Sequence, residues 1–136
     1  LIAEGIGHKN WRLVFQSRSG PSTQPWLEPD ICAYLAEIKE AGTEDVVIAP
    51  VGFISDHMEV LYDLDTEARM LCEKINLNLV RASTVGAHPA FVKMIRELIL
   101  ERMNPEIPRR HLGTRGTSHD VCPADCCLMS ARPVSA

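Results

Sequence analysis

Short apolar runs recur along the first hundred residues of the chain. They cover residues 11–17, 46–51 and 77–82, and their length is typical of strands. The run at 46–51 is almost continuously apolar, which predicts a strand that is buried on both faces. The chain therefore contains three candidate strands.

Longer segments between and after these runs have apolar residues at helical spacing. They cover residues 30–41, 56–75 and 89–103. Gly42 is placed to end the first helix, and Pro89 suits the first turn of the last. The alternation predicts an α/β fold in which a parallel sheet of three to four strands is flanked by helices. Ligands of such folds bind beyond the carboxyl ends of the strands, so we expect function in loops 17–29 and 52–57.

The composition of the carboxyl-terminal segment differs from that of the rest of the chain. Residues 104–136 contain four prolines and four arginines and have no periodic apolar pattern. We therefore expect a folded domain at residues 1–103 and a tail that is ordered only where something ties it down.

The cysteines divide into two groups. Three of them lie within six residues of the tail, which indicates metal or redox chemistry in a reducing compartment: Cys122, Cys126 and Cys127. Cys32 and Cys72 fall in predicted helices, where we expect them to pack in the core.

The overall charge and hydropathy exclude several classes of protein. The net charge is −4, with 46% apolar and 24% charged residues, and this mild acidity argues against a nucleic-acid-binding domain. No apolar run approaches the roughly 20 residues that cross a bilayer, and no signal-peptide pattern is present, so we expect a cytoplasmic protein. Residues 1–5 begin with Leu and resemble the end of a helix, so we expect further sequence before them.

Carboxylates form a line on the helix predicted at residues 56–75. At roughly 100° per residue, four of them lie within an arc of about 80°: Asp56, Glu59, Asp63 and Glu67. Like charges four residues apart repel, and no Lys or Arg offsets them between Ser55 and Arg69. Such a line of oxygen ligands suits a divalent metal ion.

The neighbours of this line leave two interpretations open. His57 would add a nitrogen ligand or a base, and it follows a predicted strand at the carboxyl edge of the sheet. The alternative is a solvated acidic face, with Ser55 or Asp56 as the N-cap of the helix.

Two blocks of the sequence resemble the ferrochelatase family. Residues 46–65 are similar to the family's strand and acidic helix, which carries the motif Asp-His-x-Glu. Residues 15–21, followed by 24–29, resemble a second family block, and the resemblance covers about residues 1–103. Ferrochelatases insert ferrous iron into a porphyrin in haem synthesis, in a cleft between two similar α/β domains. The resemblance implies that this chain supplies the second domain and that the N-terminal domain is missing.

The resemblance also implies roles for individual residues. Glu59 matches the catalytic glutamate, and Asp56 and His57 match its motif neighbours. Asp63 and Glu67, together with Glu59, match the family's acidic line that carries metal ions or protons. The matches near the porphyrin are Gln16, Ser17, Arg18 and Trp26. Carboxylates suit this reaction because two pyrrole N–H protons must leave as the iron enters.

One family residue has no counterpart in this sequence. The active-site histidine of the family lies upstream of both blocks, and four histidines here lie in no matching motif: His8, His88, His111 and His119. We therefore expect the chain to be inactive by itself. His8 and His88 are expected to be surface or capping residues.

The tail resembles the cysteine-rich extension on which some ferrochelatases carry a [2Fe-2S] cluster. This implies Cys122, Cys126 and Cys127 as three ligands, with the fourth outside this chain. The spacing C-x3-C-C differs from the animal pattern C-x2-C-x4-C. Free thiols or adventitious zinc binding are the alternatives.

The tail and the Arg-Ser-Gly-Pro loop most resemble actinobacterial members of the family. This implies coproporphyrin III, rather than protoporphyrin IX, as the substrate. The alternatives are a cobalt or nickel chelatase of the same fold, and a non-catalytic metal or Fe–S binding module.

Overall fold

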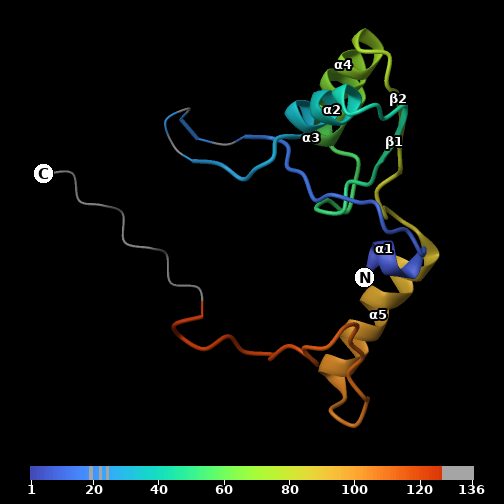
Figure 1. Ribbon diagram of the computed structural model, residues 1–136. Coiled ribbons are helices and arrows are strands. Elements are labelled where there is room, and N and C mark those ends of the chain that lie inside the picture. The colour runs from blue at the N-terminus through green and yellow to red at the C-terminus, as the bar shows by residue number, and fades with distance from the viewer. Residues whose placement is uncertain (19, 22, 24, 127–136) are drawn as a thin grey trace, which may run out of the picture. The chain divides into compact units, whose positions relative to one another are not determined.

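The computed structural model describes residues 1–18, 20–21, 23 and 25–126 of the chain (Figure 1). The chain divides into two compact units, Leu1–Ile95 and Arg96–Ala136. The elements follow in the order α1 (Ile2–Gly5), α2 (Ile31–Glu40), β1 (Asp45–Ile48), α3 (Met58–Val60), η1 (Leu61–Ala68), α4 (Arg69–Lys74), β2 (Asn78–Arg81) and α5 (Pro89–Met103).

The sheet of the first unit is parallel, as the alternation of strands and helices predicts. β1 pairs with β2 in a register that runs from Asp45 beside Asn78 to Ile48 beside Arg81. These are the two strands of the part of the chain that the structure describes. The α/β class with a parallel sheet is confirmed, but the sheet is narrower than expected.

The strand predicted at residues 11–17 is not formed. Phe15 makes only an isolated parallel bridge to Asp30. Its backbone N–H donates to Pro29 at 2.9 Å, and its carbonyl accepts from Ile31 at 2.9 Å. The apolar run thus docks against the start of α2 instead of joining the sheet.

The prediction that the 46–51 run is buried on both faces is also wrong. Along β1, exposed and half-buried residues alternate. Val47 and its register partner Val80 are 69% and 55% exposed, while Val46 and Ile48 pack against the core. The alternation shows that helices cover only one face of this sheet.

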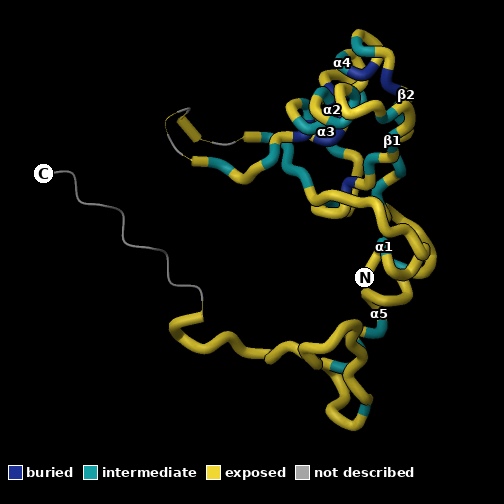
Figure 2. Tube along the Cα trace, in the orientation of Figure 1, coloured by how far each residue is buried: buried dark blue, intermediate teal, exposed yellow. Residues whose placement is uncertain are grey.

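The core lies between α2 and the long helix formed by α3, η1 and α4 (Figure 2). Every fourth residue of the long helix is fully buried: Val60, Leu64, Ala68 and Cys72. Ile31 and Leu35 of α2 pack against this row, together with Leu77. The core packing expected of Cys72 is confirmed.

The middle of the long helix is a π-helix, whose hydrogen bonds span five residues instead of four. Because a π-helix is wider, each residue turns the chain through less than 100°. A row of residues spaced by four therefore drifts less around the axis than in an α-helix. This keeps both the buried row and the carboxylates beside it aligned along the helix.

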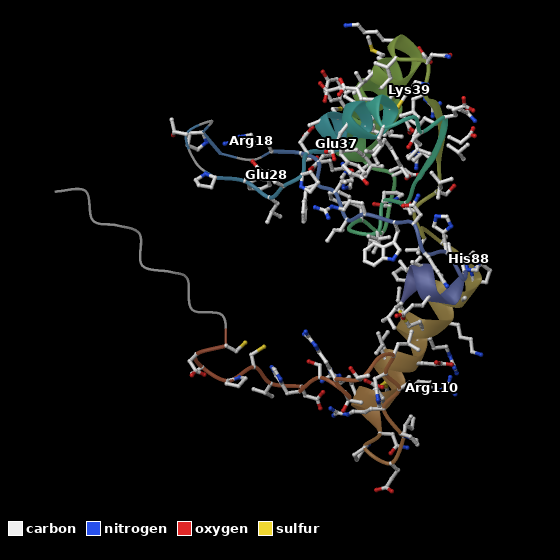
Figure 3. The ribbon with its side chains drawn as sticks, viewed as in Figure 1. Arg18, Glu28, Glu37, Lys39, His88 and Arg110 are labelled. Carbon is white, nitrogen blue, oxygen red and sulfur yellow. The ribbon has the colours of Figure 1, made fainter. Side chains whose placement is uncertain are left out.

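Two predicted helix ends agree with the structure. Gly42 follows α2 with φ of +94°, a left-handed conformation that glycine adopts without strain. α5 begins at Pro89, and Nδ1 of His88 accepts a hydrogen bond from the backbone N–H of Ala90 at 3.2 Å. Figure 3 labels this capping histidine at the start of α5.

The second unit consists of the end of α5 and the described part of the tail. Residues 104–126 form turns, and Asp120 pairs with both Arg102 of α5 and Arg109. Arg110 pairs with Glu97 at 3.3 Å. In the described residues, no helix is both long enough and apolar enough to cross a membrane.

Candidate functional site

A pocket lies between the loop that precedes α2 and the outer face of η1. Its lining combines the loop residues, the start of α2 and two carboxylates of the acidic line: Gln16, Ser17, Arg18, Asp30, Ile31, Cys32, Asp63 and Glu67. The structure therefore brings three of the four residues expected near the porphyrin to two of the residues expected on the metal or proton path.

Asp63 is the point at which the loop and the helix meet. Ser17 Oγ donates a hydrogen bond to Asp63 Oδ2, and Gln16 Nε2 lies 3.5 Å from the same oxygen. Ser17 has a φ of +60°, a left-handed conformation that costs free energy in a residue other than glycine. The hydrogen bond compensates for part of this cost.

The loop carries charges of both signs. Figure 3 labels Arg18 and Glu28 on its outgoing and returning limbs. Arg18 Nη2 donates to the Pro21 carbonyl at 3.4 Å. Positive charge at Arg18 thus lies in the same pocket lining as the carboxylates of Asp63 and Glu67.

Trp26 is half-buried on the same loop but does not line the pocket. Its indole Nε1 is buried and makes no hydrogen bond with any described residue. A buried donor without a partner is uncommon, so the indole N–H is available to a ligand or to another segment of protein.

The motif residues Asp56, His57 and Glu59 lie at the start of the long helix, after β1. Glu59 is exposed. His57 is half-buried and packs edge-to-face on Phe53, with ring centroids 4.6 Å apart. His57, not Ser55 or Asp56, occupies the N-cap position, and its side chain makes no capping hydrogen bond. The predicted cap is wrong, because the Asp56 carboxylate pairs with Arg81 instead of with the first turn of the helix.

Arg81, at the carboxyl end of β2, is the partner of Asp56. Its Nη1 lies 3.0 Å from Asp56 Oδ1. Its Nε and Nη2 also donate to the two oxygens of Asp65, at 2.6 and 2.7 Å. This bond holds the pKa of Asp65 below its ordinary value and raises that of Arg81.

Sequence reasoning did not single out Arg81. Asp56 precedes the long helix and Asp65 lies within it, whereas Arg81 lies on the strand β2, which follows that helix. Only the parallel pairing of β1 with β2 brings this cation to the start of the acidic helix. An arginine at the carboxyl end of a predicted strand was the available signal.

The two cysteines of the first unit differ in position. Cys72 is 1% exposed, and burial raises the pKa of its thiol. Cys32 is half-buried and packs against the core, as expected, but it also lines the pocket. Burial and the carboxylates of Asp30 and Glu67 raise its pKa. The thiol is therefore protonated beside the acidic line.

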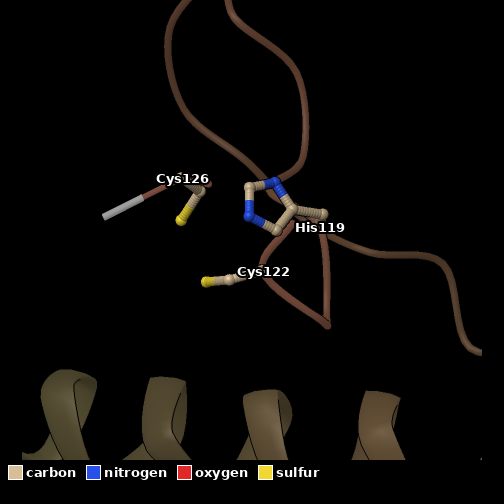
Figure 4. Close-up of side chains that lie close together, drawn as sticks. All are labelled: His119, Cys122 and Cys126. Atoms are coloured by element: carbon tan, nitrogen blue, oxygen red, sulfur yellow. The ribbon is translucent and has the colours of Figure 1, made fainter. Parts of the chain in front are cut away.

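The tail brings together three side chains that could hold a metal ion (Figure 4). The ligand atoms of His119, Cys122 and Cys126 lie within 4.8 Å of one another, and all three residues are exposed. Cys122 and Cys126 were expected as ligands, but His119 was not. Cys127, the third expected thiol, lies outside the described residues. The spacing H-x2-C-x3-C was the available signal for His119.

Known proteins match this chain over most of its length. The profile of the family described as Ferrochelatase matches residues 1–103. Over 133 residues the chain is 51% identical to the Ferrochelatase of Rhodopirellula baltica. This match covers 97% of the chain and 38% of the Rhodopirellula protein. It is 52% identical over 137 residues to the Coproporphyrin III ferrochelatase of Streptomyces coelicolor. That match covers 97% of this chain and 36% of the Streptomyces protein.

The similarity includes the tail. Over 140 residues the chain is 40% identical to the Coproporphyrin III ferrochelatase of Nocardia farcinica. The match covers 100% of this chain and 40% of the Nocardia protein. The chain thus spans between a third and a half of the length of these relatives. It belongs to the ferrochelatase family.

Proposed function

We propose that this chain is the carboxyl-terminal part of a ferrochelatase, which inserts ferrous iron into a porphyrin in haem biosynthesis. The match to the family over residues 1–103 carries this proposal, because it includes both the acidic helix and the loop that meets it. The domain would occupy residues 1–103, with residues 104–136 as the tail. The partners are a porphyrin, ferrous iron and an N-terminal domain that completes the cleft.

The site residues divide the chemistry between them. Two pyrrole protons must leave as iron enters, and Glu59, at the start of the helix, is the proposed acceptor, with Asp56 and His57 beside it. Asp63 and Glu67 provide oxygen ligands through which the iron ion loses its water molecules stepwise, or through which protons leave. The alignment of a π-helix supports a path along its face.

The loop is proposed to bind the porphyrin. Gln16 and Ser17 lie beside Asp63, so a macrocycle bound there would be held close to the acidic line. Arg18 supplies a positive charge that suits a porphyrin carboxylate. Trp26 offers an aromatic face and a buried indole N–H that pairs with none of the described residues.

Coproporphyrin III is the proposed substrate, and protoporphyrin IX is the alternative. Relatives from Streptomyces coelicolor and Nocardia farcinica carry the name Coproporphyrin III ferrochelatase, and the chain matches them over 97% and 100% of its length. Iron insertion into each porphyrin by the complete protein would distinguish the two. A higher kcat/KM for protoporphyrin IX would contradict the proposed substrate.

A [2Fe-2S] cluster in the tail is a further part of the proposal. Cys122 and Cys126 lie close enough to bind one iron, which fits such a cluster. Cys127 and a ligand outside this chain would complete the set. When it is bound, such a cluster can transfer electrons or stabilise the segments that hold it. Reduced thiols favour a cytoplasmic location, which cell fractionation would test.

The catalytic proposal is tested in the complete protein, with its upstream domain, by replacing Glu59 with Gln. Loss of the proton acceptor should lower kcat for iron insertion by roughly 100-fold or more. Glu73→Gln is a matched control, because Glu73 is an exposed carboxylate farther along the same long helix. Equal activity of both variants would overturn the assignment.

The same assay separates the other possible functions. A protein that binds metal but no porphyrin would be a non-catalytic metal-binding module. Insertion of cobalt or nickel in strong preference to iron would indicate a different chelatase of the same fold.

A further inference from the structure

We propose that His119, Cys122 and Cys126 form a site for a single Zn²⁺ ion. Their nearest ligand atoms all lie within 4.8 Å of one another, and all three side chains are exposed and reachable by an ion. The site is independent of the iron-insertion chemistry, and it differs from the proposed cluster because it uses an imidazole.

The spacing between the three ligand atoms suits a single bound ion. Tetrahedral zinc with bonds of about 2.0–2.3 Å places its ligand atoms roughly 3.5–3.8 Å apart, so a small adjustment within the observed 4.8 Å suffices. Each iron of a [2Fe-2S] cluster takes only two protein ligands. Three ligand atoms gathered at one point therefore suit a mononuclear centre.

The chemistry of the three groups matches zinc. Two thiolates and an imidazole form the Cys2His set that zinc binds, and water or another group can take the fourth position. Each thiol loses its proton as it binds and His119 binds in its neutral form, so two protons leave for each ion bound. The local spacing, with two and then three residues between ligands, is short enough for a compact site.

Contacts on both sides hold His119 in place. The preceding Ser118 carbonyl accepts a hydrogen bond from Arg109 Nη1 at 3.5 Å. The following Asp120 pairs with Arg109 and with Arg102 of α5. The backbone N–H of Cys126 donates to Pro123 at 3.1 Å, which turns the chain back toward Cys122. These contacts lower the entropy cost of assembling the three ligands.

The two metal-bound states of the tail exclude each other, because both use Cys122 and Cys126. The proposed cluster needs a ligand from outside this chain, whereas the zinc site does not. His119 distinguishes them, since zinc binding requires it and the cluster does not. Failure of one proposal therefore leaves the other intact.

The test measures zinc binding by the reduced, metal-free 136-residue chain in competition with a chromophoric chelator. We expect one Zn²⁺ per chain, and His119→Ala should weaken binding by roughly 100-fold or more. His111→Ala is the matched control, an exposed histidine of the same tail outside the cluster. Circular dichroism would verify that the variants keep the secondary structure of the parent.

Cobalt provides a second, spectroscopic readout. Co²⁺ in the same chain should give thiolate charge-transfer bands and the intense visible bands of tetrahedral coordination, and Cys122→Ser should weaken both. The proposal is overturned if the parent chain retains no zinc against the chelator. It is also overturned if His119→Ala and His111→Ala bind zinc equally well. Visible Fe–S bands of the complete protein, purified anaerobically, test the cluster separately.

Discussion

Ser17 donates a hydrogen bond to Asp63 and so connects the loop before α2 to the π-helix, across 46 positions of the sequence. The serine lies in a left-handed backbone conformation, and the aspartate is part of the acidic line. This contact holds the loop against the carboxylates.

Two substitutions at Ser17 should separate the hydrogen bond from the backbone conformation. Ser17→Ala loses the bond and keeps the unfavourable φ, whereas Ser17→Gly loses the bond but relieves the strain. We expect Ser17→Gly to be more stable than Ser17→Ala by about 1 kcal/mol, measured by urea denaturation of the complete protein. Equal stability would show that the left-handed conformation costs nothing at this position.

Substitution of the acidic line should change the response to iron more than the response to porphyrin. In the complete protein, Asp63→Asn and Glu67→Gln each remove a negative charge from the pocket, so the KM for ferrous iron should rise by roughly 3- to 30-fold. Steady-state assays with each substrate varied in turn would measure this. Glu37→Gln, at an exposed position of α2, serves as the control and should leave both KM values unchanged.

The bond between Arg81 and Asp65 should make stability depend on pH. The pKa of Asp65 is lowered in the folded protein, so its contribution is fully present above the unfolded pKa of about 3.9. That contribution is lost as the pH falls through the lowered, folded pKa. Asp65→Asn should therefore cost about 1–2 kcal/mol at pH 6 and progressively less below pH 4.

Urea denaturation of the complete protein at several pH values would measure the cost of Asp65→Asn. Arg81→Ala should lose the same pH-dependent increment, because it removes the partner. A cost that stays constant from pH 6 to pH 3 would contradict the role of this ion pair.

The two classes of cysteine should react at different rates. Cys72 is buried with a raised pKa, while Cys122 is exposed. In reduced, chelator-treated native protein, iodoacetamide should modify Cys122 at least tenfold faster than Cys72, as followed by mass spectrometry. Unfolding in urea should remove most of the difference. Similar rates in the native state would show that the core around Cys72 opens readily.

The helices of this chain could be predicted from the sequence, because apolar spacing and end residues act within a few positions of one another. Apolar spacing located α2, the long helix and α5 closely, and Gly42 and Pro89 fixed two of the ends. The strands were harder to predict, since the run at residues 11–17 has strand-like composition but no strand to pair with. Pairing is a property of two segments, and composition reports on only one.

The sequence by itself determined the family blocks, the parallel α/β class, the line of carboxylates and the thiols of the tail. Only the tertiary structure decided which of these side chains meet. It placed Ser17 on Asp63 and brought Arg81 to Asp56 and Asp65. The reason is physical. Helical periodicity arises from neighbours within a turn, whereas these hydrogen bonds and ion pairs join residues that lie far apart in the sequence, and that separation carries no information about their distance in space.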